Sequence, residues 1–477
     1  MAPDTPNRPD PRLTAALIAA KAAGLVIRRM GRGGGTAAPG LIADRIDPGL
    51  LAKICDRLPS GVLVVAGTNG KTTTSRMIAD ILEADGHRVA HNRTGSNLVR
   101  GVASALAGRS SLSGDPRADV GVIESDEAAL PAILRLTHPR VLALNNLFRD
   151  QLDRYGELNA IAVSWRAAFE RLGPETTIVA NGDDPTLAAI TEGLVARRVL
   201  FGLDDPASRH RLTALPHAAD AATCRRCGAD LAYDALYSAH LGDWRCAGCA
   251  AARPLLDVAG RDIVLDGVDA LQTVVDWPGA GEPLPISVAI PGMYNVYNTV
   301  CAVAAATCMG ASRAAIADAL ASFRSAFGRI ERVRYRDRNL VMALVKNPVG
   351  FNETLRMLIT ASGRLETPTL IAINDLHADG RDISWLWDVD FEQLADGATP
   401  LYTAGLRGAD MANRLKYAGV AADRLHPLTN DLAVALDEFV ERTPVGETAY
   451  VLPSYTAMLA LRKVLSDRGA VETFWRQ

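Results

Sequence analysis

The segment from Val62 to Ala84 constrains the fold more than any other. A short β-branched run, Val62–Val65, leads directly into Gly67-Thr-Asn-Gly-Lys-Thr-Thr-Thr74, and a helical pattern follows from Ser75 to Ala84. A glycine-rich turn between a buried strand and a helix presents backbone N–H groups and the positive end of the helix to a bound anion. The segment therefore predicts a phosphate-binding loop within a parallel α/β sheet.

The residue types in this turn indicate a nucleotide with Mg²⁺. Lys71 supplies a positive charge for the β- and γ-phosphates, and Thr72 supplies a hydroxyl ligand for the metal. The first glycine of the commonest spacing would fall at Val65, so the spacing departs from that pattern. The flanking strand and helix still make a purely structural turn the weaker interpretation. The predicted ATP-binding residues of the turn are Gly67, Thr68, Asn69, Gly70, Lys71, Thr72 and Thr73.

An acidic turn supplies a carboxylate for the metal. Glu124 directly follows the apolar run Val120–Ile123 and precedes Ser125-Asp-Glu127. Taken alone, the turn would be a solvated loop. Because parallel sheets bind ligands at the carboxyl ends of their strands, we predict that Glu124 is a Mg²⁺ ligand and acts in catalysis with Lys71.

Length and pattern indicate several domains. A chain of 477 residues is too long for one ordinary core. Apolar runs alternate with helical stretches, as in α/β proteins: strands are expected at 62–65, 120–123, 141–144 and 177–180, and again near 340–345, 369–373, 401–403 and 449–452. We predict an N-terminal helix with a glycine-rich loop at 1–55, an ATP-binding α/β domain at 56–332 with an insertion at about 215–256, and a C-terminal α/β domain at 333–477.

Four of the seven cysteines form two CxxC pairs. Cys224-x-x-Cys227 and Cys246-x-x-Cys249 are separated by 18 residues. Without a convincing secretory signal, this spacing favours a metal over disulfides. Four thiolates around zinc leave no position for water, so the site is predicted to be structural. The other cysteines, Cys55, Cys301 and Cys308, lie in apolar surroundings and are predicted to be unreactive.

Charge and hydropathy exclude two classes of protein. The net charge of −3 and the lack of a basic block argue against nucleic-acid binding. No apolar run reaches the roughly 18–20 residues that span a bilayer, so no transmembrane segment is expected. The apolar stretch Leu13–Ile27 contains Lys21 and is interpreted as an amphipathic helix packed on the body, in preference to a signal peptide. We expect a cytoplasmic protein, because the predicted site needs ATP.

Five motifs, in this order, resemble those of the Mur ligases. They cover roughly residues 60–335: Gly67–Thr73, the Glu124 turn, Asn181-Gly-Asp-Asp-Pro185, Gly292-Met-Tyr-Asn-Val-Tyr-Asn298 and Gly328-Arg-Ile-Glu331. The resemblance implies that Asn295 and Asn298 lie near the adenine of ATP. It also implies that Arg329 lies at a hinge between the central and C-terminal domains.

Two departures narrow the resemblance. Gln151 stands where amino-acid-adding Mur ligases usually have a histidine, and the stretch Val163–Leu172 has no lysine that could be carbamylated. The N-terminal region is also too short for a full UDP-sugar-binding domain. Over nearly its whole length the chain instead resembles the MurT family, through Gly31–Gly35, Arg149–Gly156, the cysteine insertion, Lys346–Gly350, Asp379–Asp388 and Tyr455–Leu459.

The MurT resemblance implies a reaction and a partner. The chain would use ATP to activate the D-glutamate α-carboxylate of the lipid II stem peptide as an acyl phosphate, and a GatD-like glutaminase subunit would supply ammonia. It would act at the inner face of the plasma membrane. An aspartate of the 379–388 stretch is implied to complete the Cys–His pair of the partner; Asp379 and Asp382 are the leading candidates and Asp388 is the third.

Two alternatives compete with this interpretation. The chain could be an amino-acid-adding Mur ligase or a folylpolyglutamate synthase-like ligase, which Gln151 and the cysteine insertion disfavour. It could also be an inactive scaffold that regulates a partner, which the intact Lys71, Thr72 and Glu124 disfavour.

Overall fold

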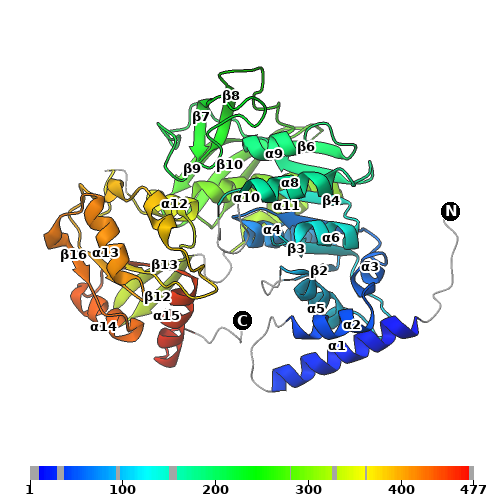
Figure 1. Cartoon of the computed structure of the whole chain (residues 1–477), viewed down its shortest axis with the longest axis horizontal. Coiled ribbons are helices and arrows are strands. Elements are labelled where there is room, and N and C mark those ends of the chain that lie inside the picture. Colours follow the sequence, from blue (N-terminus) through cyan, green and yellow to red (C-terminus); the bar gives the residue numbers. More distant parts are fainter. Residues whose placement is uncertain are drawn as a thin grey trace.

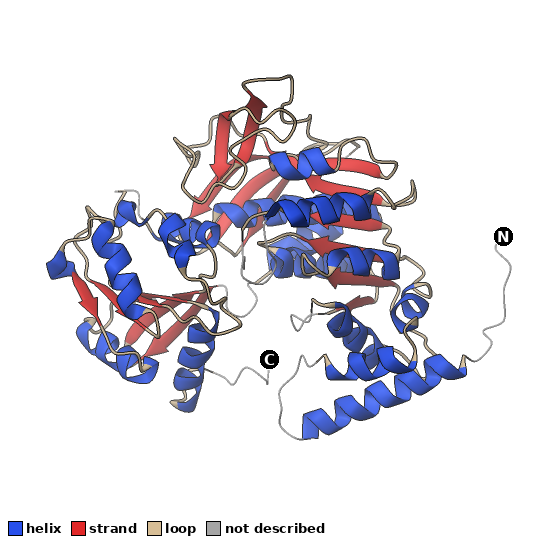
Figure 2. Ribbon diagram, in the orientation of Figure 1, coloured by secondary structure: helices blue, strands red, loops and turns tan. Residues whose placement is uncertain are grey.

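A nine-stranded sheet forms the centre of the molecule (Figures 1 and 2). The computed structural model describes residues 10–29, 37–92, 97–149, 158–279, 281–324, 330–359 and 363–471. The strand order is β11-β10-β9-β6-β5-β4-β1-β3-β2, with β9 to β11 antiparallel and the others parallel. The strands are β1 (Val62–Ala66), β2 (Val89–His91), β3 (Val120–Glu124), β4 (Val141–Leu144), β5 (Thr177–Asn181), β6 (Arg197–Leu203), β9 (Val258–Asp266), β10 (Ala270–Asp276) and β11 (Leu284–Val288).

Helices cover both faces of this sheet, which explains the uninterrupted apolar runs. In β1, Leu63 and Val65 belong to one core and Val62 and Val64 to the other, and all four are buried. A strand covered on both sides needs apolar residues at every position. One core contains α4 (Lys71–Ala84), α10 (Met293–Met309) and α11 (Arg313–Ser322); the other contains α1 (Pro11–Arg29), α2 (Ala38–Ile46), α3 (Leu50–Cys55), α5 (Val99–Arg109), α6 (Leu130–Thr137), α8 (Leu158–Phe169) and α9 (Pro185–Ile190).

A small antiparallel hairpin interrupts the chain between β6 and β9. It consists of β7 (Leu231–Ser238) and β8 (Leu241–Cys246), which form a separate two-stranded sheet. In Figure 1 this hairpin stands at the upper edge of the molecule, beside α9 and β6. The two CxxC pairs lie at one end of the hairpin, where β7 begins and β8 ends.

The C-terminal part forms a second α/β unit. Its six strands have the order β12-β13-β17-β14-β15-β16, with β12 antiparallel to β13 and the remaining pairs parallel. Its elements are β12 (Ile330–Tyr335), β13 (Arg338–Ala343), α12 (Pro348–Leu358), β14 (Thr369–Ala372), the 3₁₀ turns η1 (Ser384–Asp388), η2 (Phe391–Leu394) and η3 (Ala422–Arg424), β15 (Leu401–Ala404), α13 (Gly408–Tyr417), β16 (Leu425–Pro427), α14 (Leu432–Arg442), β17 (Thr448–Pro453) and α15 (Tyr455–Asp467).

The structure confirms the predicted α/β fold class and every strand that the apolar runs indicated. The N-terminal helix is also present, and it packs through Leu13, Ala16, Leu17 and Ala20. Within the described ranges, no helix combines the length and hydropathy needed to cross a bilayer. Three features singled out in the sequence lie outside the described residues: the glycine run 31–35, the segment 150–156 with Gln151, and Arg329.

Candidate functional site

The end of β4 holds the glycine-rich turn in place. The Thr68 hydroxyl donates to the carbonyl of Phe148 at 3.0 Å and accepts from the Phe148 amide at 3.0 Å. The amide of Asn69 donates to the Asn146 side-chain oxygen at 2.8 Å. These contacts join residues about 80 positions apart, so the turn is shaped by the neighbouring strand as well as by its own glycines.

Asn298 of α10 lies directly against the turn, and Asn295 lies behind it. Gly70 adopts a left-handed φ of 83°, and a Cβ there would come within 1.9 Å of the Asn298 side-chain oxygen, so only glycine fits. Asn145 donates to the same oxygen at 3.2 Å, and Asn298 donates to Asn295 at 2.9 Å. The structure thus brings Asn295 and Asn298, both predicted from the resemblance, together with the phosphate loop.

Lys71 is buried and turned back onto the loop. Its Nζ donates to the carbonyls of Gly67 at 2.5 Å and Thr68 at 3.1 Å, and it forms an ion pair of 3.0 Å with Glu127. The Glu127 carbonyl accepts a hydrogen bond from the Trp165 indole at 2.9 Å. The anionic partner of Lys71 in this state is therefore a protein carboxylate.

Sequence reasoning missed the role of Glu127. It recognised the residue as part of the acidic turn but assigned it no function. The only signal was a second carboxylate three residues after Glu124, and its pairing with Lys71 depends on how β3 and the loop lie in space.

Thr72 and Glu124 lie together as a metal site would require. The Thr72 hydroxyl donates to the Glu124 carboxylate at 3.2 Å. Asn92 fixes the Glu124 backbone from both sides, accepting from its amide and donating to its carbonyl, each at 2.9 Å. A hydroxyl and a carboxylate at the carboxyl edge of the sheet are oxygen ligands of the kind Mg²⁺ takes beside phosphates, so these residues fit that ion.

The four predicted zinc ligands form one cluster. Their Sγ atoms all lie within 4.8 Å of one another, with 3.8 Å between Cys224 and Cys249 and 3.4 Å between Cys227 and Cys246. Tetrahedral zinc with Zn–S bonds of about 2.3 Å places sulfurs about 3.8 Å apart. The donor set therefore fits a structural zinc ion.

The other end of the same hairpin reaches Phe148, whose backbone holds Thr68 of the phosphate loop. His240, in the turn between β7 and β8, is fully buried, and its ring lies 4.7 Å from that of Phe148. Its Nδ1 accepts from the amide of Asp220 at 3.1 Å. The Asp220 carboxylate forms an ion pair with Arg149, which also contacts Asp388 of the C-terminal unit at 3.1 Å. The insertion thus links the end of β4 to both parts of the molecule.

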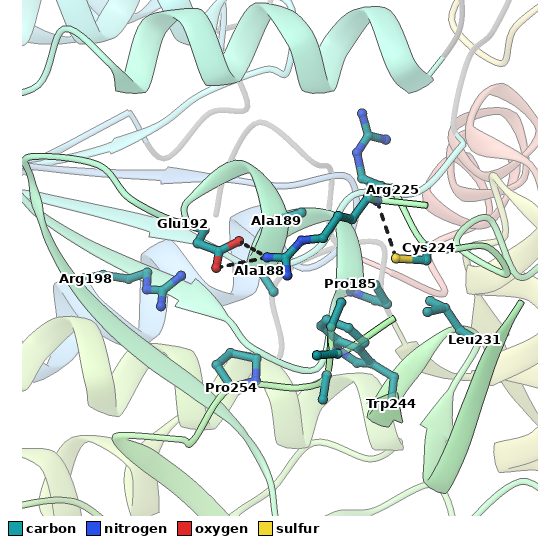
Figure 3. Close-up of a pocket in the computed structure, with 14 residues that line it drawn as sticks. Pro185, Ala188, Ala189, Glu192, Arg198, Cys224, Arg225, Leu231, Trp244 and Pro254 are labelled. Atoms are coloured by element: carbon teal, nitrogen blue, oxygen red, sulfur yellow. Dashed lines mark hydrogen bonds and ion pairs between the residues drawn. The ribbon is translucent and has the colours of Figure 1, made fainter. Parts of the chain in front are cut away.

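A cavity of about 180 Å³ lies between α9 and the cysteine cluster (Figure 3). Pro185 and Trp244 contribute to its apolar wall, and Arg198 and Glu192 line it on the other side. No residue of the phosphate loop lines this cavity, so it is separate from the predicted nucleotide site.

The two leading aspartates of the C-terminal unit differ in exposure. Asp379 is buried, and its carboxylate accepts from the Leu376 amide at 3.1 Å and from the amide and hydroxyl of Thr456 at 2.8 and 2.5 Å. Asp382 is exposed and accepts from the Ser384 amide at 2.8 Å. Asp379 therefore connects the loop after β14 to the start of α15 by hydrogen bonds, whereas Asp382 is open to solvent.

The buried Lys71–Glu127 pair should show strong coupling in stability. Lys71→Met or Glu127→Gln alone leaves one buried charge without its partner, which costs about 3–5 kcal/mol. The double variant restores neutrality and should be more stable than the sum of the single effects, as measured by urea unfolding. The exposed pair Arg166–Glu170 is the matched control and should show a coupling below about 1 kcal/mol. Additive effects at Lys71 and Glu127 would contradict the pairing.

Metal content provides a second test. Protein purified anaerobically should contain one zinc per chain, and Cys227→Ser should lower both the zinc content and the melting temperature, because the ion holds an insertion with little core of its own. Cys308→Ser, outside the cluster, should retain the zinc. Metal analysis that finds no zinc in the unmodified chain would rule out the site.

Known families match most of this chain. A family model described as "Mur ligase middle domain" matches residues 65–225, and one described as "MurT ligase C-terminal" matches residues 344–458. Together they include the phosphate loop, the Glu124 turn and the Asp379–Asp388 stretch, and of the four clustered cysteines they include only Cys224.

Individual proteins agree with the family models. The chain is 32% identical to the "Lipid II isoglutaminyl synthase (glutamine-hydrolyzing) subunit MurT" of Streptococcus pneumoniae, over 96% of this chain and 98% of that protein. It is 28% identical to the protein of the same name from Staphylococcus aureus, over 85% and 88%. Among solved structures, a pseudomurein peptide ligase type C from Methanothermus fervidus superposes with a TM-score of 0.66 over 85% of this chain and 78% of that one.

The structural match is only 17% identical and shows a shared Mur-ligase-like fold. The near full-length match to the pneumococcal protein goes further, because it extends through the insertion and the C-terminal unit. On this evidence the chain belongs to the MurT family of Mur-ligase-like proteins.

Proposed function

We propose that this chain is the ATP-dependent synthetase subunit of a two-subunit enzyme that amidates the D-glutamate α-carboxylate of lipid II to D-isoglutamine. The observation that carries the proposal is the assembly of Lys71, Thr72 and Glu124 at the carboxyl edge of the sheet. The chain that carries this assembly is similar, over 98% of the other protein's length, to a protein named as a subunit of that synthase.

The first chemical step is activation of the carboxylate. A carboxylate oxygen attacks the γ-phosphorus of ATP, forming an acyl phosphate and releasing ADP. Lys71 would exchange Glu127 for the phosphate oxygens, and the loop amides would bind the same charge. Thr72 and Glu124 would hold Mg²⁺, which neutralises charge on the phosphates when bound.

The second step needs ammonia from outside this chain. NH₃ attacks the acyl carbon, phosphate leaves, and the nitrogen loses a proton to give the amide. A glutaminase that works through a thiolate needs an accessible cysteine of low pKa. Burial raises the pKa of Cys55 to about 12 and that of Cys308 to about 11, and it raises that of Cys301 further. The other four cysteines form the cluster, so this chain offers no such nucleophile.

One edge of the C-terminal sheet has the character of a partner surface. Leu376, Leu406 and Tyr455 follow the carboxyl ends of β14, β15 and β17, and each is more than 40% exposed. Exposed apolar side chains gathered at one edge are typical of a protein–protein interface. A GatD-like glutaminase subunit binding here would meet the loop that carries Asp382.

Asp382 suits the partner's site better than Asp379. A carboxylate that orients another protein's imidazole must be accessible and must have a free lone pair. Asp382 is exposed, whereas both oxygens of Asp379 already accept hydrogen bonds inside the C-terminal unit. We therefore assign the triad role to Asp382 and a structural role to Asp379.

The proposed function also involves a structural metal and a membrane surface. Zinc at the cysteine cluster would fix the hairpin whose His240 ring lies against Phe148 at the phosphate loop. Because the acceptor is lipid-linked, we propose that the protein acts in the cytoplasm at the inner face of the plasma membrane.

The ligase site is tested by a variant that preserves buried neutrality. Lys71→Met combined with Glu127→Gln should lower amidation by about 10²–10³-fold or more, because an electrostatic contact to the transferred phosphoryl group is lost. The loss should be equal with glutamine and with ammonium as the nitrogen source, measured as isoglutaminyl product in the two-subunit complex. Arg166→Gln with Glu170→Gln is the control. Near-normal amidation by the folded double variant would refute the assignment.

The division of labour is tested at the two aspartates. Asp382→Asn in the complex should abolish glutamine-driven amidation and leave amidation driven by concentrated ammonium at raised pH, since free NH₃ bypasses the glutaminase. Asp379→Asn should instead lower the melting temperature and affect both nitrogen sources alike. An Asp382→Asn complex with full glutamine-driven activity would contradict the assignment, and Asp388 would then be the candidate.

A further inference from the structure

The outward face of α1 is apolar from Ala15 to Val26, with the exposed Arg12 and Arg29 at its two ends. Its exposed positions include Ala15, Ile18, Ala22, Leu25 and Arg29, which recur every three or four residues and so lie on one side of the helix. Ile18, Leu25 and the adjacent Val26 are 51%, 47% and 54% exposed. A surface helix normally turns polar residues outward. In α13, for comparison, three of the five exposed positions are polar, namely Asp410, Asn413 and Lys416, and the other two are Ala409 and Tyr417.

The opposite face fixes α1 to the body. Leu13 and Leu17 are fully buried, the Lys21 ammonium donates to the carbonyl of Gly108 in α5 at 2.9 Å, and the Arg12 guanidinium donates to that of Ile46 at 2.6 Å. The helix therefore cannot roll its apolar outer face inward without losing these contacts. In Figure 1, α1 is the outermost element at the lower edge, with α2 and α5 between it and the sheet.

The charges of α1 are all of one sign. The helix contains Arg12, Lys21, Arg28 and Arg29 and no acidic residue. A second copy docking through the same face would bring two cationic helices together, which electrostatic repulsion opposes. An anionic lipid surface complements both the apolar outer face and the net positive charge of the helix.

We propose that the outer face of α1, formed by Ile18, Leu25 and Val26, seats this protein on anionic membrane lipid. The inference deepens the proposed function, since it rests on a lipid-linked acceptor and names the surface that meets the bilayer.

The helix α5 connects this surface to the candidate metal site. The last turn of α5 accepts the Lys21 bond at Gly108, and Asn97, just before α5, accepts from the Asp126 amide in the Glu124 turn at 3.0 Å. A helix of 11 residues spans about 16 Å. Seating α1 on the bilayer would thus hold the site close to the surface where a lipid-linked stem peptide is anchored.

Vesicle sedimentation of the two-subunit complex tests the surface without any substrate. The probes are phosphatidylcholine vesicles with and without phosphatidylglycerol. The unmodified complex should sediment with the anionic vesicles, and less so as salt is raised. Replacing Ile18, Leu25 and Val26 together by Glu should weaken this partition by at least about tenfold. The matched control replaces Val163, Val195 and Val445 by Glu; these are 65%, 72% and 68% exposed elsewhere on the surface.

Each outcome decides the proposal. The proposal would be overturned if the unmodified complex did not sediment with anionic vesicles. It would also be overturned if the α1 variant sedimented with them as the control does. An α1 variant that changes only the oligomeric state, or only glutaminase binding, would assign the face to a protein and overturn it too. Amidation of a water-soluble stem-peptide acceptor should be equal in the α1 variant and the control, and its absence from the unmodified complex would count against the proposed function, not against the surface.

Discussion

The phosphate loop keeps its shape because the end of β4 holds it. The paired hydrogen bonds between Thr68 and Phe148, and the bond from Asn69 to Asn146, fix the turn before any nucleotide arrives. Arg149, which follows Phe148, forms ion pairs with Asp220 of the insertion and Asp388 of the C-terminal unit. One short segment therefore contacts the loop, the cysteine-bearing insertion and the second α/β unit, and the positions of all three depend on it.

The counter-charge of Lys71 comes from the turn after β3. Glu127 neutralises Lys71 in a buried setting, where an unpaired ammonium would be costly. The hydroxyl of Thr72 and the backbone of Glu124, which Asn92 holds, complete the site that we propose for a phosphate and a metal. A nucleotide bound as proposed would exchange one anion for another and would not have to create the site. A preorganised electrostatic site of this kind lowers a reaction barrier.

The sequence predicted the strands well because their physics is local. A strand covered on both faces, such as Val62–Val65 in β1, must be apolar at each position, and that pattern is visible without the fold. The cysteine spacing was equally informative, since four thiols at this separation suit one ion. The Lys71–Glu127 pair and the contrast between Asp379 and Asp382 depend on contacts between distant segments, such as Thr456 with Asp379, and no short pattern contains them.

The hairpin of β7 and β8 connects the cysteine cluster to the residues that hold the phosphate loop, so binding at one end can affect binding at the other. Its cysteine end can bind an ion, and its His240 end lies against Phe148, whose backbone holds Thr68 of the loop. If these contacts tighten when the loop is filled, thermodynamic linkage makes the effect reciprocal. Bound nucleotide would then raise the affinity for the metal, and loss of the metal would weaken nucleotide binding by the same factor, so that part of the free energy of nucleotide binding would depend on the distant ion.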